Sequence, residues 1–371
     1  MLEKAPQFGE IGAGLQLAPN ASHALASLGV LDAIAPYAVY PRRLLWRDAR
    51  SGARVTALDL GERFRAHYGH PYVVMHRGDL LDVLLAAARA EPRIVLEVTR
   101  DVVDVLEDDR GVRAVCADGT TFAGSAIVAA DGLWSRLRKL VHDDGEPIPA
   151  RYVAYRGTIP VAELWEGAGL EDVTLWTAPG LHFVQYPIRG GMLFNQVAVF
   201  RSDRFRADGD DWGLPDELDA HFAVGCDAVA AGIARIRRDR RWTMYDREPI
   251  AQWSRGRMAL LGDAAHPMLQ YLAQGACQAL EDAVVLADAL AAYDDPADAF
   301  VAYRDRRYLR TARVQYSARL FGEIWHCGDV GATLRDAMLA PRADDDFAHV
   351  EWLYGWRPGP SSHPEPVEGS G

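Results

Sequence analysis

Two groups of residues in this 371-residue sequence have the types and spacing needed for chemistry. The first surrounds Asp263, which follows an apolar run at Met258–Leu261 and precedes an alanine-rich stretch from Gly275. The run predicts a buried strand, and the i, i+3, i+4 apolar spacing after Gly275 predicts a helix. A helix N-terminus stabilises anions, and a carboxylate at a strand end accepts hydrogen bonds from hydroxyls. This junction therefore suits a polyphosphate or flavin cofactor.

The second group is the pair His182 and Tyr186, which stand four residues apart in an aromatic-rich segment. Side chains with this spacing on a strand point to the same face, so the pair could line a substrate pocket. An imidazole that titrates near neutral pH can take or share a proton from a substrate. The same spacing is also typical of a half-buried, hydrogen-bonded structural pair, and the residues alone leave both interpretations open.

The string GDAAHPMLQYLAQGACQALEDA at 262–283 resembles the second flavin-binding motif of the class A aromatic hydroxylases, which are single-component monooxygenases using FAD and NAD(P)H. The resemblance implies that Asp263 holds the ribityl chain of FAD. It also implies that Gly275 and Ala276 offer N–H groups to the flavin C2 carbonyl and that Pro267 packs beside the reactive edge of the ring. His266, next to Pro267, could be purely structural.

Two further segments resemble cofactor motifs of this family. One ends at Arg77, before a predicted amphipathic helix with Asp79 in its first turn. The resemblance implies that Arg77 reaches the phosphate and ribityl region of FAD, although a helix-capping role accounts for the segment as well. The other is Asp131-Gly132, followed by Arg136 on a basic helix, which the resemblance places near both FAD and NAD(P)H. An Asp-Gly pair alone is more often a turn.

The N-terminal segment LEKAPQFGEIGAG resembles the end of the family's first β-α-β unit, with Glu3 in the place of the acidic ribose ligand. The strand and GxGxxG turn that would hold the FAD pyrophosphate, about 30 residues, are absent from the sequence. A late start codon and a truncated chain both account for this, so an inactive fragment without FAD is one alternative. The missing unit would expose apolar sheet surface and predicts poor FAD retention.

The loop after this segment holds Gly12, Gly14 and Gln16, which the resemblance places near the flavin ring and the substrate. A structural role explains these residues equally well: they could form a turn and a helix cap before a predicted helix from about Asn20 to Leu28.

Gln270 is the residue that best discriminates among substrates. Many relatives that hydroxylate salicylate have proline at this position, whereas the 3-hydroxybenzoate 6-hydroxylases resemble the Leu-Gln-Tyr of this chain, and they carry an H-x-x-x-Y pair like His182 and Tyr186. An amide at this position could orient the ring for attack, while a loop residue facing water is the plainer interpretation.

The resemblance implies hydroxylation of a phenolic aromatic acid by FAD, NADH or NADPH, and O2 through a C4a-hydroperoxyflavin. The expected reaction converts 3-hydroxybenzoate to 2,5-dihydroxybenzoate, and decarboxylating hydroxylation of salicylate is the alternative. The expected catalytic residues are His182, Tyr186, Gln270 and Pro267.

Composition excludes several other classes. A net charge of −12 and an isoelectric point near 5.4 argue against nucleic acid or anionic membrane as a partner, because both would be repelled. Four scattered cysteines favour neither a metal site nor a disulfide framework. The sequence has no signal peptide and no run of about 20 apolar residues, which predicts a cytoplasmic protein. The resemblance implies a homodimer.

The expected fold is α/β, an N-terminally truncated Rossmann-like FAD-binding domain of the aromatic hydroxylase type with an inserted mixed β-sheet substrate domain and C-terminal helices. The predicted parts are an FAD-binding domain at 1–148 and 251–295, a substrate-binding sheet at 149–250, a helical segment at 296–358 and a disordered tail at 359–371.

Overall fold

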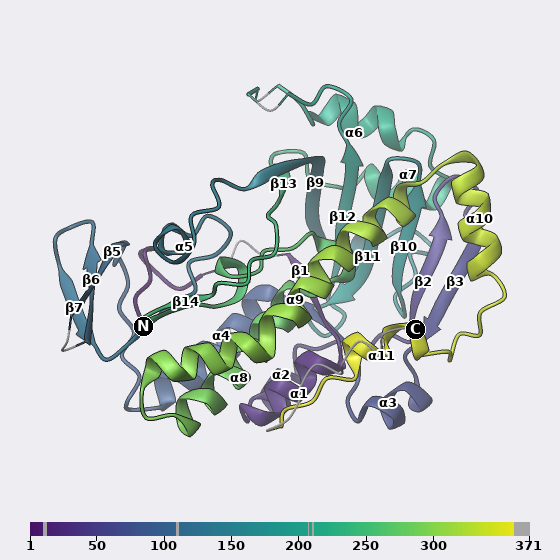
Figure 1. Ribbon diagram of the computed structural model, residues 1–371. Coiled ribbons are helices and arrows are strands. Elements are labelled where there is room, and N and C mark those ends of the chain that lie inside the picture. Colours follow the sequence, from purple (N-terminus) through teal and green to yellow (C-terminus); the bar gives the residue numbers. More distant parts are fainter. Residues whose placement is uncertain (10–12, 109–110, 207, 210, 360–371) are drawn as a thin grey trace, which may run out of the picture.

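The computed structural model describes residues 1–9, 13–108, 111–206, 208–209 and 211–359. A large β-sheet occupies one end of the molecule, and short strands and helices occupy the other (Figure 1). The long helix α9 (Pro296–His326) crosses between the two ends. Most of the predicted tail, residues 360–371, and the candidate Gly12 lie outside the described residues.

The large sheet has seven strands, and all neighbouring pairs are antiparallel except β10 and β2. In spatial order they are β13 (Trp242–Asp246), β9 (Ile148–Pro160), β12 (Leu193–Arg201), β11 (Leu181–Ile188), β10 (Val173–Ala178), β2 (Arg43–Asp48) and β3 (Arg54–Asp59). The predicted sheet at 149–250 is thus present, and the hairpin of β2 and β3 belongs to the same sheet.

The turn between β11 and β12 contains Arg189-Gly190-Gly191. All three residues have left-handed backbone conformations, with φ of 53°, 62° and 84°. Glycine adopts this conformation without the steric cost that a Cβ brings, so two adjacent glycines make the turn feasible.

The two faces of β11 pack against different elements. A Cβ at Gly232 of α7 (Asp227–Ile233) would lie 2.6 Å from the Phe183 ring, so the odd-numbered side chains face α7. The His182 ring, on the opposite face, lies 5.2 Å from the Trp325 ring of α9. Because side chains alternate along a strand, Tyr186 shares the face of His182.

The predicted strand, loop and helix after Gly256 are present. Strand β15 (Met258–Leu260) pairs in parallel with β8 (Ile127–Ala129) and antiparallel with β14 (Ser254–Arg255). Two 3-10 turns, η2 (Gly262–Ala264) and η3 (Gln270–Leu272), lead to α8 (Gly275–Ala292). The carboxyl ends of β15 and β8 therefore meet beside the start of α8.

The other strands form two small antiparallel sheets. They are the pair β1 (Gly14–Leu17) and β4 (Val73–His76), and the meander β5 (Val102–Asp108), β6 (Gly111–Cys116) and β7 (Thr121–Gly124). Residues 94–101 form no regular strand ahead of β5, and β7 does not continue into β8. Before β5 only Glu97 pairs, in an isolated parallel bridge with Leu2, and β7 and β8 belong to different sheets.

Local sequence signals set several helix starts. The side chain of His76 accepts a hydrogen bond from the Gly78 N–H at the start of α4 (Arg77–Ala90), and Asp295 caps α9 ahead of Pro296. The remaining helices are α1 (Pro19–Ser27), α2 (Leu31–Ile34), α3 (Glu62–Tyr68), α5 (Arg136–Val141), η1 (Val161–Glu163), α6 (Pro215–Phe222), α10 (Asp329–Leu339) and α11 (Ala348–Tyr354). Among the described helices, none has the length and apolar character to cross a bilayer.

A buried ionic cluster joins α8 to α9. Glu281 and Asp282 of α8 and Arg307 of α9 are all fully buried, and Arg307 pairs with both carboxylates. Arg310 adds a second ion pair to Glu281 at 2.7 Å, and Asn20 of α1 donates to the same carboxylate at 2.6 Å. Two arginines thus balance two carboxylates, which fixes the two long helices relative to each other.

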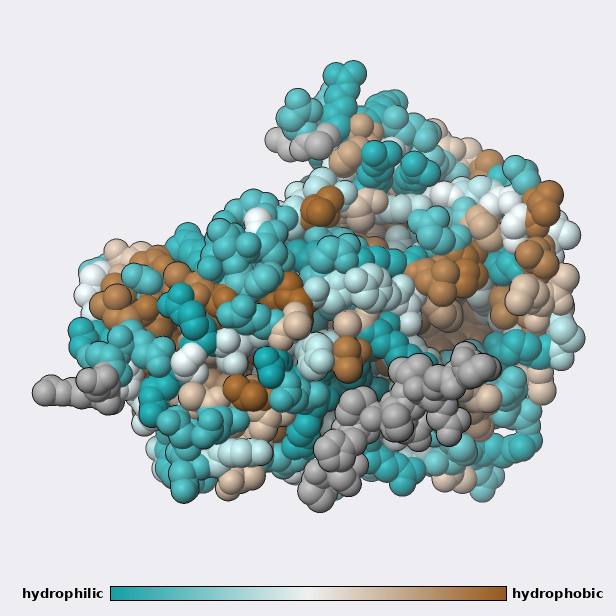
Figure 2. Space-filling model, in the orientation of Figure 1, coloured by the Kyte–Doolittle hydropathy of each residue, from teal (hydrophilic) through white to brown (hydrophobic). Residues whose placement is uncertain are grey.

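The face seen in Figure 2 is mostly hydrophilic, with hydrophobic side chains in separate patches. Helices α9 and α10 lie on this face (Figure 1). Their exposed large hydrophobic residues are Val301, Leu309, Tyr316, Leu320, Val330, Leu334 and Met338.

Candidate active site

The N-terminus of α8 and the side chain of Asp263 lie together. Gly275 begins α8, no side chain caps the helix, and a Cβ at Gly275 would lie 3.9 Å from Asp263 Oδ1. Part of Asp263 is exposed to solvent, but protein atoms surround its carboxyl group. The resulting loss of hydration raises the pKa of this carboxyl group. Backbone N–H groups of the first helical turn, including those of Gly275 and Ala276, thus border the same space as a carboxylate.

Arg77 contributes positive charge to this region. It is the first residue of α4, and it is exposed. Burial raises the pKa of Asp263 and of Tyr186, and in both cases the charge of Arg77 acts in the opposite direction. The structure therefore brings together Arg77 and Asp263 and places Tyr186 within reach of the same charge.

Tyr186 packs against the strand that carries Gly14 and Gln16. The Gly14 N–H donates to Asn195 Oδ1 at 2.8 Å, and Asn195 stands opposite Tyr186 in the β11–β12 register. A Cβ at Gly14 would lie 2.7 Å from both side chains, so only glycine fits without movement. Gln16 accepts a hydrogen bond from Tyr72 at 2.7 Å and also hydrogen-bonds Tyr186.

Gln270 is held by Arg156 of β9. The Arg156 Nη2 donates to Gln270 Oε1 at 2.7 Å, and the charge of Arg156 also lowers the pKa of Tyr186 against the larger effect of burial. Gln270 is half-buried, and its predicted role toward the substrate stays a prediction. The amide has a fixed orientation beside the face that carries Tyr186.

His182 lies further along the same face and is fully buried. Its Nδ1 lies 2.8 Å from Nε2 of His326, the last residue of α9, and its ring lies 5.5 Å from that of Tyr271. Burial lowers the pKa of His182 well below the ordinary value. The imidazole is therefore neutral near pH 7.

His266 and Pro267 are buried in the loop before η3. His266 Nε2 hydrogen-bonds Asp282 at 2.6 Å, and the carbonyl oxygen of Pro267 accepts from Gln315 of α9 at 2.9 Å. The backbone N–H of Gly262 donates to the same carboxylate of Asp282. These bonds hold the loop, and a structural role for His266 accounts for its contacts.

Glu3, Asp131 and Arg136 make local contacts. Glu3 accepts a hydrogen bond from the Ala5 N–H, and Arg136 pairs with Asp101 on the surface. Asp131 accepts from Ser135 Oγ and from the Leu137 N–H at the start of α5, which fits the turn-and-cap interpretation. Their predicted roles toward FAD and NAD(P)H remain predictions.

Three residues of this region were missed by sequence reasoning: Arg156, Asn195 and His326. Arg156 lies in the aromatic-rich segment, and Asn195 becomes visible once β11 and β12 are paired in register. His326 carries no local signal, because it is 144 residues from His182.

The residues present fit the flavin half of FAD. An uncapped helix N-terminus suits an anionic ring, and Asp263 and Arg77 are suitable partners for ribityl hydroxyls and phosphate. Gly132, with φ of 79°, has no heavy atom within 4 Å of an added Cβ, so open space lies there as well.

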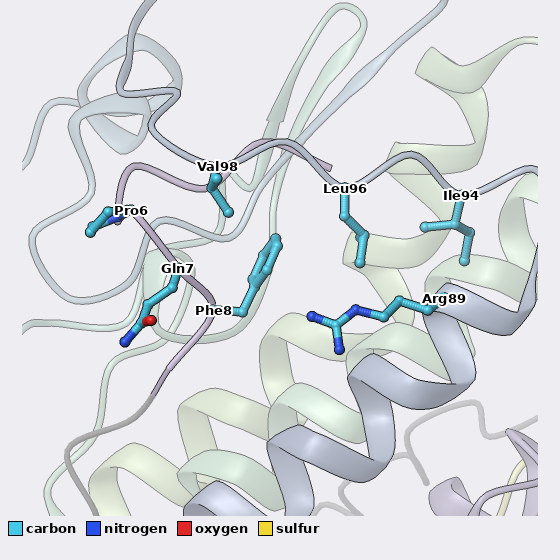
Figure 3. A pocket seen from close by; sticks show the side chains of 7 residues that line it. All are labelled: Pro6, Gln7, Phe8, Arg89, Ile94, Leu96 and Val98. Carbon is cyan, nitrogen blue, oxygen red and sulfur yellow. The ribbon is translucent and has the colours of Figure 1, made fainter.

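A separate hollow of about 570 Å³ lies elsewhere on the molecule (Figure 3). The N-terminal segment and residues 94–98 border it, and Arg89 extends from α4 toward Phe8. None of the candidate site residues lines it, so it has no part in the site described above.

Comparison with known proteins agrees with this geometry. The family described as FAD binding domain matches residues 1–315. A 3-hydroxybenzoate 6-hydroxylase of Aquipseudomonas alcaligenes is 38% identical over 360 residues, covering 96% of this chain and 91% of the relative. The chain belongs to the FAD-dependent aromatic hydroxylases.

Solved structures share the fold of this hydroxylase. HpxO of Klebsiella pneumoniae, in complex with FAD and uric acid, aligns with a TM-score of 0.83 at 26% identity, covering 95% of this chain and 89% of the other. A salicylate hydroxylase in complex with substrate aligns with a TM-score of 0.78 at 25% identity, covering 93% and 88%. The hydroxylase thus has the predicted mixed α/β fold, and FAD is its cofactor.

Proposed function

We propose that this chain hydroxylates 3-hydroxybenzoate to 2,5-dihydroxybenzoate, with NADH or NADPH as the electron source and O2 as the oxidant. The observation that carries this proposal is the Arg156–Gln270 hydrogen bond, at 2.7 Å, beside the face of β11 that bears His182 and Tyr186. The relative at 38% identity, a 3-hydroxybenzoate 6-hydroxylase, supports the choice of substrate.

Arg156 and Arg77 supply positive charge for a carboxylate substrate. Both arginines act electrostatically on Tyr186, so their charges reach the same part of the site. In a protein with a net charge of −12, such a local concentration of positive charge is needed to attract an acid. The Gln270 amide, held by Arg156, can hydrogen-bond the substrate and fix its orientation.

His182 is the group that acts on the phenol. A ring oxygen that has lost its proton donates electrons to the ring more strongly. A neutral imidazole that accepts or shares this proton therefore lowers the barrier to hydroxylation, and such catalysis typically raises the rate about 10²–10⁴-fold. Tyr186 and Asn195 hold the neighbouring wall in place through their contacts with Gln16 and Gly14 of β1.

The cofactor side of the site has a different task. When bound, reduced FAD reacts with O2 and provides the oxygen atom that enters the substrate. Gly275 and Ala276 donate N–H groups toward negative charge on the ring, and Asp263 and Arg77 hold the ribityl and phosphate groups. Pro267 packs at the reactive edge, where it helps to exclude water.

Decarboxylating hydroxylation of salicylate is the second candidate. The shared fold with a salicylate hydroxylase favours it. The glutamine at position 270, where many salicylate-specific relatives have proline, argues for 3-hydroxybenzoate.

Several further assignments belong to this proposal. Glu3, Asp131, Gly132 and Arg136 contact the cofactors. The boundaries between the parts of the chain lie after residues 148, 250, 295 and 358.

The protein acts in the cytoplasm as a homodimer, and the exposed hydrophobic residues of α9 and α10 are candidates for the contact between subunits.

Product identification tests the proposal. FAD-loaded protein is incubated with NADH or NADPH and either 3-hydroxybenzoate or salicylate, and the products are separated by chromatography. The proposal predicts 2,5-dihydroxybenzoate from 3-hydroxybenzoate. Catechol from salicylate without turnover of 3-hydroxybenzoate would favour the second candidate, and protein that binds no FAD would favour an inactive fragment.

A further inference from the structure

His182 does not stand alone in the wall of the site. Its Nδ1 lies 2.8 Å from Nε2 of His326, and the two rings are close to parallel, with centroids 5.1 Å apart and 23° between their planes. Both residues are buried, so this contact is a hydrogen bond screened from water. Since Nδ1 is engaged, Nε2 is the nitrogen of His182 that can meet a substrate oxygen.

His326 is fixed by its surroundings. Its ring stacks on Tyr152 of β9, with centroids 4.7 Å apart and 22° between the planes, and Tyr271 approaches it edge-on at 5.4 Å. It is the last residue of α9, and its carbonyl oxygen accepts a hydrogen bond from Gly180 at 3.1 Å. The ring therefore has little freedom to turn away from His182.

The other nitrogen of His326, Nδ1, is buried and has no hydrogen-bond partner among the described residues. Unpaired buried polar atoms are rare and cost about 1–3 kcal/mol, so their presence calls for an explanation. A nitrogen that gains and loses a proton during turnover is one explanation that links it to the site.

A single buried imidazole is a poor final acceptor for a phenol proton. Burial lowers the pKa of His182 well below its ordinary value and that of His326 to about 3, so neither ring holds a positive charge readily. The titratable groups that face the two histidines are Tyr271 of η3 and Tyr152 of β9. The charge of Glu323 of α9 helps to raise the pKa of both tyrosines. Burial and the neighbouring imidazole lower the pKa of His182, and burial alone lowers that of His326, so no carboxylate among the described residues supports a cation there.

We propose that His326 is a positioning residue that makes His182 part of a two-histidine proton relay, and this proposal rests on the proposed function. The phenol O–H bond breaks and an N–H bond forms at His182 Nε2. The proton on His182 Nδ1 moves to His326 Nε2, and the proton on His326 Nδ1 passes to a water molecule. Both imidazoles end neutral, and His182 then donates its Nε2–H to the phenolate oxygen.

Three variants separate a relay from a purely structural role. His326→Gln keeps a polar group at the position of Nε2 but cannot pass a proton between two nitrogens. His326→Phe keeps the stacking on Tyr152 and removes the hydrogen bond. Trp325→Phe is the matched control, because Trp325 packs against the His182 ring at 5.2 Å from the same end of α9.

The first measurement needs no turnover. Oxidised, FAD-loaded protein is mixed with 3-hydroxybenzoate in weak buffer, and a pH-indicator dye reports proton release on binding. We expect release by the wild type and by Trp325→Phe, and release at least about tenfold slower by both His326 variants. Ultraviolet difference spectra should show the bound phenolate forming at higher pH in these two variants.

Steady-state kinetics provides the second readout. Both His326 variants should lose about tenfold or more in kcat, with KM within about threefold of the wild type. Wild-type kcat and proton release in His326→Gln would overturn the relay and leave only an orienting contact. If His326→Phe does not fold, His326→Gln still decides the matter.

Failure of the relay and failure of the proposed function are distinguishable. A wild-type protein that binds FAD but does not hydroxylate 3-hydroxybenzoate contradicts the proposed function and the relay with it. A wild type that hydroxylates 3-hydroxybenzoate, with His326 variants that match it, contradicts the relay alone.

Discussion

The Gln270 amide owes its orientation to Arg156, and this contact carries the substrate assignment. A hydrogen bond to a charged group contributes about 1.5–3 kcal/mol, so we predict that Gln270→Ala lowers kcat/KM for 3-hydroxybenzoate by about 10- to 100-fold. Gln270→Glu should raise KM further, because it neutralises Arg156 and repels the carboxylate. Met192→Ala, an exposed change in the turn between β11 and β12, is the control. Unchanged kcat/KM in Gln270→Ala would remove this residue from the site.

Asp282 links stability to pH. Burial alone would raise the pKa of this carboxyl group, but His266, Arg307 and hydrogen bonds hold it at about 2, below the ordinary 3.8. A depressed carboxyl pKa contributes stability that is complete above about pH 4 and is lost as the pH falls through about 2.

We predict that Asp282→Asn is less stable at pH 7 by about 3–5 kcal/mol, because it leaves buried Arg307 with one carboxylate fewer. The variant should also lose less stability than the wild type on acidification below about pH 4. Urea unfolding, followed by tryptophan fluorescence, measures both effects. A variant as stable as the wild type at pH 7 would show that the buried pair contributes little.

The site residues that could be predicted are those in contiguous motifs, such as Asp263, Gly275 and Gln270. Those that could not are joined to the site only by tertiary contacts: Arg156 is 114 residues from Gln270, and Asn195 is 181 residues from Gly14. Residue type and local spacing contain no information about such pairs until the strand order and register of the sheet are known.

At the scale of elements, α8 has two separate functions. Its first turn borders Asp263, and its middle carries Glu281 and Asp282 into the ionic cluster with α9. The cluster fixes where the helix N-terminus points, because movement of either carboxylate would break one of the two buried ion pairs of Arg307.

Gly275→Ala tests the cofactor role of the helix start. An added Cβ would have only Asp263 Oδ1 nearby, at 3.9 Å, so the FAD-free protein should keep its thermal midpoint. The methyl group would project into the space assigned to the flavin, and we predict FAD binding weaker by about tenfold, or about 1.4 kcal/mol. Flavin fluorescence titration measures the affinity. Equal affinity in the variant would mean that the flavin does not approach Gly275.

Elements with strong local signals were predicted well, among them α4, α8, α9 and β15. The segment at 94–100 has β-branched residues that favour a strand, but it forms only an isolated bridge at Glu97 and separate hydrogen bonds from Thr99 and Arg100 to the N-terminal segment. Sheet membership could not be predicted either: β7 and β8 are adjacent in sequence yet pair with strands of different sheets.

At the scale of the whole molecule, two layers of side chains meet at the proposed active site. The seven-stranded sheet contributes His182, Tyr186 and Arg156, and the loop from β15 to α8 contributes Asp263 and Gln270. Neither part alone has both an anion-stabilising helix start and a substrate-binding face. The expected weak retention of FAD remains a prediction, which the flavin absorbance of the purified protein tests.

The central claim is that this molecule transfers one oxygen atom from O2 to the ring of 3-hydroxybenzoate. Mass spectrometry of the product formed under ¹⁸O2 by the FAD-loaded protein, supplied with NADH or NADPH, tests it most directly. We predict 2,5-dihydroxybenzoate that carries a single ¹⁸O atom in its new hydroxyl group. Oxidation of NADH or NADPH that yields only hydrogen peroxide would contradict this oxygen transfer, and so would a product without the ¹⁸O label.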